Sequence, residues 1–126
     1  MISEITYDED RERLNIKTFG KASGEGFLAL NTRMVEHPSW KPETKVLCDF
    51  SALDLSNISR QDAENSAKFF QSLSTKLKGA RIAAIMNKDV GYGITRMWAT
   101  LTISPEVPFE IMAFRSFDDA VEWLHS

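Results

Sequence analysis

The sequence predicts an α/β domain in which an N-terminal antiparallel hairpin leads into repeated strand–helix units. Alternating apolar and polar residues at 2–7 and 13–19 flank a polar turn, as in a hairpin at a sheet edge. Nearly continuous apolar runs at 45–50 and 81–86 indicate strands buried on both faces. Segments with helical periodicity separate the strands, so we expect the order ββαβαβαβα, with a five-stranded mixed sheet and four helices.

The composition of the chain indicates which broad classes of protein it can belong to. The 126 residues are 43% hydrophobic and 26% charged, which fits one soluble domain spanning 1–126. A net charge of -3 without a basic block argues against a nucleic-acid partner. No apolar run approaches the roughly 20 residues of a transmembrane helix, and the N-terminus is too polar for a signal peptide. We therefore expect a cytoplasmic protein, which the single Cys48 also fits.

The first helix is expected to begin after Ser23, a good N-cap, and to end before Pro38. Its core stripe consists of Phe27, Leu30 and Met34. Trp40 follows in a loop between two prolines. It either covers the end of the core or forms the rim of a pocket or of a membrane-facing patch.

The strand at 45–50 and the helix after it carry two candidate functional residues. Asp49 is predicted at the carboxyl end of a central strand, where open α/β sheets place their sites. The alternative is that its carboxylate bonds backbone groups of the following residues. Ser59 is the expected N-cap of a long helix, with Asp62 three residues later, and Gly79 is its expected C-cap.

The helix expected over 90–103 has more apolar surface than its core contact needs. Asp89 is its predicted N-cap. The predicted core stripe consists of Val90, Ile94, Met97, Trp98 and Leu101. The opposite face consists of Tyr92, Arg96, Ala99 and Ile103. Two glycines in its first turn each weaken the helix by about 1 kcal/mol relative to alanine, which makes that turn a candidate hinge.

A strand at 109–114 and a helix capped by Ser116 complete the predicted fold. If each strand lies beside the one before it, right-handed crossovers place all the helices on one face of the sheet.

No residue pattern of catalysis, metal binding or cofactor binding is present. Two histidines and one cysteine, without paired spacing, do not predict a zinc site. Gly91-Tyr92-Gly93 has part of a dinucleotide-binding pattern, but Arg96 stands where the third glycine is needed. Asp49, Asp89 and Arg96 could form a polar site at the carboxyl ends of the strands, but they include no nucleophile. We therefore expect no enzyme, no metal and no cofactor.

Three stretches carry a resemblance to a known family. They are Val46–Ser51, Gly93–Trp98 and Phe114–Leu124. Together with the element order, they resemble the SpoIIAA-like family of small bacterial proteins, which is related in fold to STAS domains and more remotely to CRAL-TRIO lipid-carrier domains. The resemblance implies a sheet flanked by helices and no enzymatic activity.

One function implied by the resemblance is a STAS-type protein-interaction or regulatory module. STAS anti-sigma antagonists are phosphorylated on a serine at the start of the helix after the central strand, and Ser59 occupies that position here. The aspartate and glycine of their motif are absent, so an ordinary N-cap is the alternative role of Ser59.

The other implied function is binding of a lipid-like or other hydrophobic molecule, with the helix over 90–103 as a mobile lid or a peripheral membrane contact. The same apolar surface would suit a homodimer interface. The candidate ligand-binding residues are Trp40, Phe69, Leu73, Tyr92, Ile94, Met97, Trp98, Leu101 and Ile103.

Overall fold

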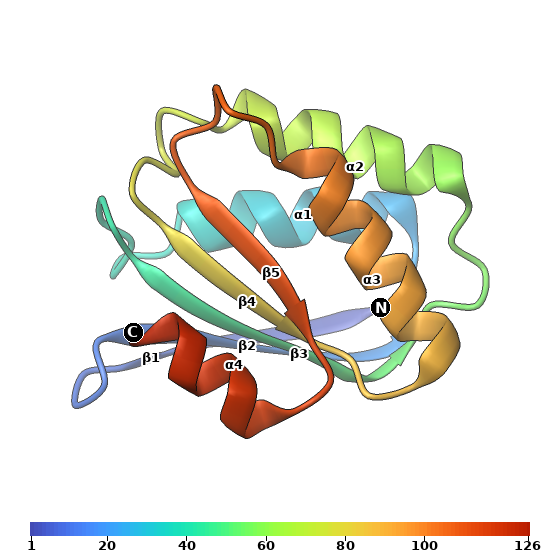
Figure 1. The fold of residues 1–126 in the computed structure, drawn as a ribbon, viewed down its shortest axis with the longest axis horizontal. Helices are drawn as coiled ribbons and strands as arrows, with labels where there is room; N and C mark the ends of the chain where they lie inside the picture. The colour runs from blue at the N-terminus through green and yellow to red at the C-terminus, as the bar shows by residue number, and fades with distance from the viewer.

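The computed structural model describes all 126 residues and contains a five-stranded sheet with four helices (Figure 1). The predicted order ββαβαβαβα is confirmed. The elements are β1 (Ile2–Asp8), β2 (Arg13–Lys21), α1 (Gly24–Val35), β3 (Lys45–Asp54), α2 (Arg60–Ser72), β4 (Arg81–Ile85), α3 (Asp89–Thr102), β5 (Glu110–Phe114) and α4 (Phe117–Leu124).

The strands lie side by side in chain order, β1-β2-β3-β4-β5. β1 and β2 are antiparallel, and every later neighbour is parallel, as predicted. In the parallel part, Val46 lies between Leu14 and Ile82. Since side chains alternate between the faces of a strand, these residues and Cys48 enter the main core on one face of the sheet, while Leu47 enters a smaller cluster on the other.

Serine side chains cap the N-termini of three of the helices. Ser23, Ser59 and Ser116 each accept a hydrogen bond from a backbone N–H of the first turn. At α2 the cap is reciprocal: the N–H of Asp62 donates to Ser59 Oγ at 3.0 Å, and the N–H of Ser59 donates to Asp62 Oδ2 at 3.0 Å. The predicted caps at these three positions are therefore confirmed.

The predicted end of α2 at Gly79 is wrong, because the helix ends at Ser72. The hydroxyls of Ser72 and Ser74 donate to the carbonyls of Phe69 and Gln71, so they compete for the acceptors of the last turn. Turns then lead to Gly79, whose positive φ of 76° suits glycine and whose N–H donates to Pro108 O at 2.7 Å.

The prediction that all helices share one face is also wrong. α1, α2 and α3 lie on one side of the sheet, and α4 lies on the other (Figure 1). Because α4 follows the last strand, it does not connect two parallel strands. The preference for right-handed crossovers therefore does not determine the face on which it lies. Its buried residues Ala120 and Leu124 cluster with Leu47, Ala83 and Ile85.

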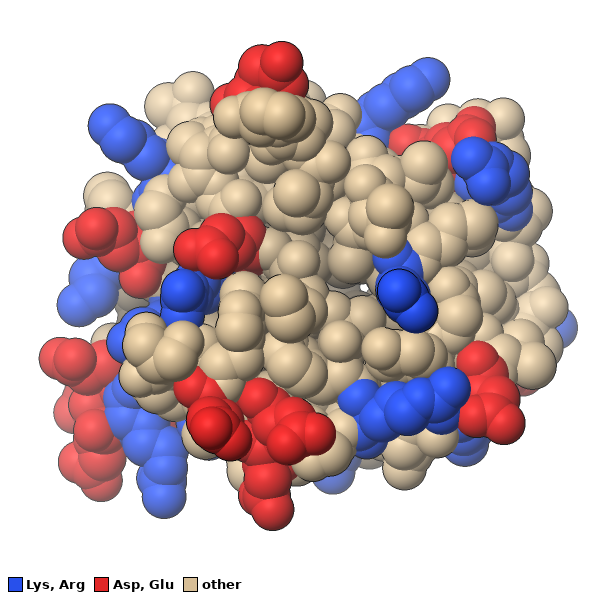
Figure 2. Space-filling model, viewed as in Figure 1, with Lys and Arg blue, Asp and Glu red and all other residues tan.

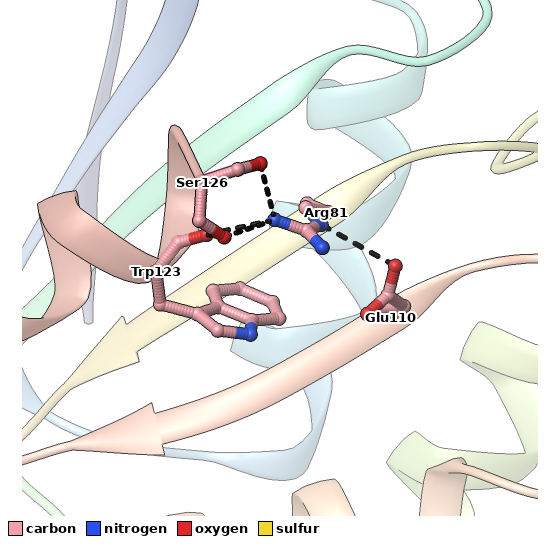
Figure 3. A network of polar contacts seen from close by, with 4 residues as sticks. All are labelled: Arg81, Glu110, Trp123 and Ser126. Carbon is pink, nitrogen blue, oxygen red and sulfur yellow. Dashed lines mark hydrogen bonds and ion pairs between the residues drawn. The ribbon is translucent and has the colours of Figure 1, made fainter.

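Arg81, the first residue of β4, ties the end of α4 to the sheet (Figure 3). One guanidinium nitrogen donates to Trp123 O at 2.8 Å and to Ser126 Oγ at 2.9 Å. Another donates to Glu110 on β5 at 3.3 Å, and the guanidinium lies 5.0 Å from the centre of the Trp123 ring. A single side chain therefore connects two strands to the helix that covers them.

The face of α3 that packs on the core differs from the predicted stripe. Its buried residues are Gly91, Thr95, Ala99 and Thr102. Val90, which was expected in the core, is 69% exposed. Small residues let the helix approach the sheet closely: a Cβ on Gly91 would lie 2.7 Å from Met86 Cε. The threonines can be buried because their hydroxyls donate to the carbonyls of Gly91 and Trp98 within the helix.

Candidate functional site

An apolar cavity lies between the sheet and the three helices α1, α2 and α3. Its volume is about 50 Å³, and 15 of its 19 lining residues are hydrophobic, so it is an apolar site. The lining residues are Ile16, Phe27, Leu30, Asn31, Met34, Val46, Cys48, Phe50, Leu55, Ile58, Asp62, Ala63, Ser66, Phe70, Ile82, Ala84, Ile94, Thr95 and Trp98.

Aromatic pairs fix two parts of the wall. Phe27 of α1 meets Phe50 of β3 edge to face, with ring centres 6.0 Å apart. Phe70 of α2 meets Trp98 of α3 edge to face at 5.5 Å. The Cys48 thiol on the floor is unsuited to nucleophilic chemistry, because its burial, and to a smaller extent the charge of Asp49, raise its pKa far above the ordinary value.

Two polar nitrogens of the lining residues have no hydrogen-bond partner. They are Nδ2 of Asn31, a residue that is 6% exposed, and Nε1 of Trp98. Most buried polar atoms in proteins are paired, so two unpaired donors among the lining residues of one apolar cavity need an explanation. By contrast, the indole of Trp40 donates to Lys76 O at 2.9 Å.

The two ends of α3 are held differently. At its N-terminus, Lys88 provides no capping side chain. The ion pair between Asp89 and Arg115 joins side chains that are 92% and 50% exposed, so it contributes little to stability. At the C-terminus, Nε2 of Gln71 donates to Thr102 O at 2.9 Å. A partly buried hydrogen bond therefore anchors the C-terminal end, whereas the N-terminal half is held by the packing of Gly91 on Met86 and by Arg115, whose guanidinium lies 4.3 Å from the centre of the Tyr92 ring.

Comparison with known proteins addresses the fold. No protein-family model matches the chain, and no curated protein does. The chain is similar to the crystal structure of an uncharacterised DUF3478-family protein with a SpoIIAA-like fold from Shewanella loihica PV-4. The TM-score is 0.58 at 23% identity, over 98% of this chain and 92% of the other.

The chain has a SpoIIAA-like fold. The resemblance drawn from the sequence is thereby confirmed for the fold, whereas the more remote likeness to CRAL-TRIO domains receives no support from these comparisons.

In this SpoIIAA-like fold, only Ile94 and Trp98 of the nine predicted ligand-binding residues line the cavity. Met97 and Leu101 face a shallow surface depression instead, because the small residues of α3 face the sheet. Phe69 does not line the cavity. Its neighbour Phe70, which is 1% exposed, lines it instead. The predicted residues outside the cavity lining are Trp40, Phe69, Leu73, Tyr92, Met97, Leu101 and Ile103.

No contact joins the three residues of the predicted polar site. Asp49 lies within β3, which extends to Asp54, and its Oδ1 accepts from the N–H of Ser51 at 2.9 Å, as the backbone-bonding alternative predicted. Asp89 is not the N-cap of α3, because Lys88 holds that position and the carboxylate pairs with Arg115 at 2.7 Å. Arg96 borders the shallow depression with Arg60. The arrangement therefore does not bring these charges to a common point.

Sequence reasoning missed the contributions of the strands and of α1 to the cavity. One signal was available: Asn31 is a polar residue inside the apolar stripe of α1, four residues after Phe27 and three before Met34. A polar residue on a buried helix face needs a partner, and no hydrogen bond to its side-chain nitrogen is present.

The charged residues of the pictured face lie mainly towards its edges, and the middle is largely uncharged (Figure 2). The exposed large hydrophobic residues of the molecule are Ile2, Val90, Ile103, Met112 and Phe117. A membrane-spanning helix is not found among α1–α4, the longest of which, α3, has 14 residues. No three His, Cys, Asp or Glu side chains are placed to hold a metal ion.

Proposed function

We propose that this domain is a non-catalytic binding module for a small hydrophobic molecule. The observation that carries the proposal is the apolar cavity between the sheet and α1–α3, with 15 hydrophobic residues among 19. Binding sites for small molecules are typically apolar cavities with few polar groups. The unreactive Cys48 and the dispersed charges Asp49, Asp89 and Arg96 support binding rather than catalysis.

The size of the cavity implies that the protein opens to admit its ligand. Its volume of about 50 Å³ is below the roughly 150 Å³ of an engineered cavity that holds benzene. α3 is the element best suited to move, because three of its residues line the cavity wall and its N-terminus has no side-chain cap. In this proposal α3 swings about its C-terminal end, where Gln71 holds it.

The N-terminal ends of α3 and α4 form the candidate surface for collecting the ligand from a membrane. Val90 is 69% exposed and Phe117 is 52% exposed, and the ion pair between Asp89 and Arg115 joins their two segments. Exposed apolar side chains of this kind can enter the interface of a bilayer.

Flotation with vesicles tests this surface. We expect the domain to float with phosphatidylcholine vesicles, and we expect the double substitution Val90→Ser and Phe117→Ser to abolish flotation. A dimer mass in light scattering that both substitutions abolish, without flotation of the wild type, would assign this surface to a homodimer instead.

A STAS-type phosphoswitch at Ser59 receives no specific support from the geometry. Both hydrogen bonds of the capping box use Ser59 and Asp62, and a phosphate would bring a further negative charge beside that carboxylate.

The cavity proposal can be tested with a matched pair on β4. Ala84 lines the cavity and Ala83 faces α4, and each is 0% exposed. We expect Ala84→Val to weaken binding of the neutral fluorescent probe N-phenyl-1-naphthylamine about tenfold, because added methyl groups fill the site. Ala83→Val should bind the probe as the wild type does. Equal affinities in all three proteins would contradict the assignment of the cavity.

A further inference from the structure

We infer that the ligand presents a neutral hydrogen-bond acceptor, such as a ketone, ester or amide carbonyl, to Asn31 Nδ2 and Trp98 Nε1. This inference rests on the proposed function and adds the chemical class of the ligand. Its basis is that the unpaired buried side-chain nitrogens of the protein belong to these two residues, and both line the same cavity.

Asn31 lies where an apolar residue would be more stable. It is 6% exposed on the core side of α1, and it shares the cavity lining with Leu30 and Met34. A buried amide without a partner loses its hydration and gains nothing in return, so the folded protein alone offers no reason for this residue. A ligand that accepts from Nδ2 would supply the missing bond.

Trp98 determines that the protein donates and the ligand accepts in this hydrogen bond. An indole N–H can only donate, whereas an asparagine side chain can turn over to present oxygen or nitrogen. The edge-to-face contact with Phe70, at an angle of 88°, restrains the indole ring. The ligand group near Trp98 must therefore be an acceptor, and Asn31 can present its own donor to the same kind of group.

The charge of the lining residues indicates that this acceptor is neutral. No lysine or arginine lines the cavity, and the one charged residue that does is Asp62. A carboxylate would lose its hydration next to another carboxylate with no cation to compensate, which is strongly unfavourable. A neutral carbonyl compound has the acceptor without this cost.

Three probes of nearly the same shape separate the possibilities: acetophenone, isopropylbenzene and benzoate. Each is titrated into ¹⁵N-labelled protein, in which Trp40, Trp98 and Trp123 give the three indole N–H signals. We expect acetophenone to move the Trp98 proton downfield while the Trp40 signal, already bonded to Lys76 O, stays in place. Trp98→Phe assigns the signal.

Affinities in variants give the quantitative test. Asn31→Leu and Trp98→Phe should each weaken acetophenone binding about fivefold more than they weaken isopropylbenzene binding, which is the usual effect of one neutral hydrogen bond. Trp40→Phe, which removes an indole outside the cavity lining, should change neither affinity. Asn31→Leu should also raise the melting temperature of the ligand-free protein, whereas loss of a structural hydrogen bond would lower it.

The outcomes are distinguishable. Equal losses for acetophenone and isopropylbenzene, or an unmoved Trp98 signal at saturation, would overturn the acceptor assignment and leave the hydrophobic site intact. Tighter binding of benzoate than of acetophenone would overturn the neutral assignment. Failure of all three probes and of N-phenyl-1-naphthylamine to bind would overturn the inference together with the proposed function.

Discussion

Three buried threonines show how single residues meet the cost of burying a polar group. Thr18 donates to Asp49 O, Thr95 to Gly91 O and Thr102 to Trp98 O, so none of these hydroxyls lacks a partner. Asn31 is buried to a similar degree without one. The contrast within one core is the reason to treat Asn31 as a ligand-facing residue.

His125 gives a prediction for the dependence of stability on pH. Burial, followed by the positive charges of Lys45, Arg13 and Arg11, lowers the pKa of this imidazole, and its Nε2 lies 3.3 Å from a guanidinium nitrogen of Arg13. Below the ordinary value of 6.5 the unfolded chain takes up the proton more readily than the folded one. We therefore expect the melting temperature to fall as pH decreases from 7 to 5.

The control for this prediction is His125→Gln, which keeps a hydrogen-bond acceptor for Arg13 and does not titrate in this range. The variant should lose most of the slope of melting temperature between pH 7 and pH 5. An unchanged slope would assign the dependence to other groups.

At the scale of the element, the two glycines near the N-terminus of α3 have different surroundings. A Cβ on Gly91 would meet the fully buried side chain of Met86 at 2.7 Å, whereas a Cβ on Gly93 would have no atom within 4 Å. The two glycines, which are separated by Tyr92, thus have different roles: Gly91 permits close packing, and Gly93 only lowers the helical preference of the N-terminal part of α3.

Alanine at the two positions should therefore have opposite effects. Gly91→Ala should destabilise the fold by about 2 kcal/mol through overpacking against Met86. Gly93→Ala should stabilise α3 by about 1 kcal/mol. Urea unfolding measures both. Because opening of α3 exposes Cys48 in our proposal, Gly93→Ala should also slow labelling of this thiol about fivefold. Faster labelling in this variant would contradict the opening of α3.

The order of the elements could be predicted from the sequence, but the face that α3 turns towards the sheet could not. The hairpin and the strands were predictable because alternation and continuous apolar runs are local signals. In α3 the largest apolar residues suggested a core face of Val90, Ile94 and Leu101. Packing against the sheet selected the small residues instead, and that choice depends on Met86 and other residues outside the helix.

The candidate site was only partly predictable for the same reason. Ile94 and Trp98 were identified, but most of the cavity wall comes from α1, α2 and three strands, whose relative positions no local pattern specifies. No local sequence pattern predicted that α4 lies on the second face of the sheet, since no following strand constrains its position.

At the scale of the molecule, the two faces of the sheet have different tasks. The face under α1–α3 contains the main core and the cavity, and the face under α4 contains a small cluster of five buried residues. α4 is short, with 8 residues, so its attachment depends heavily on the polar contacts of Arg81 at its C-terminal end.

Arg81→Met should destabilise the protein by about 2 kcal/mol, because partly buried, charge-assisted hydrogen bonds are lost. Amide hydrogen exchange should rise most in α4. Arg60→Met is the matched control: it removes an ion pair with Glu64 whose arginine side chain is 68% exposed, so a loss of less than about 0.5 kcal/mol is expected. Equal losses of unfolding free energy in the two variants would show that the contacts of Arg81 stabilise the protein no more than an exposed ion pair does.

The cavity beneath α3 also makes the protein sensitive to hydrostatic pressure. Its volume of about 50 Å³ is equivalent to about 30 mL/mol, and the volume change of unfolding scales with such internal volume. Compression should therefore favour the unfolded chain, and Ala84→Val should raise the midpoint pressure of unfolding more than Ala83→Val does. A bound molecule would remove the same volume difference, so high-pressure fluorescence would report occupancy of the site even for a ligand that has no colour, charge or label.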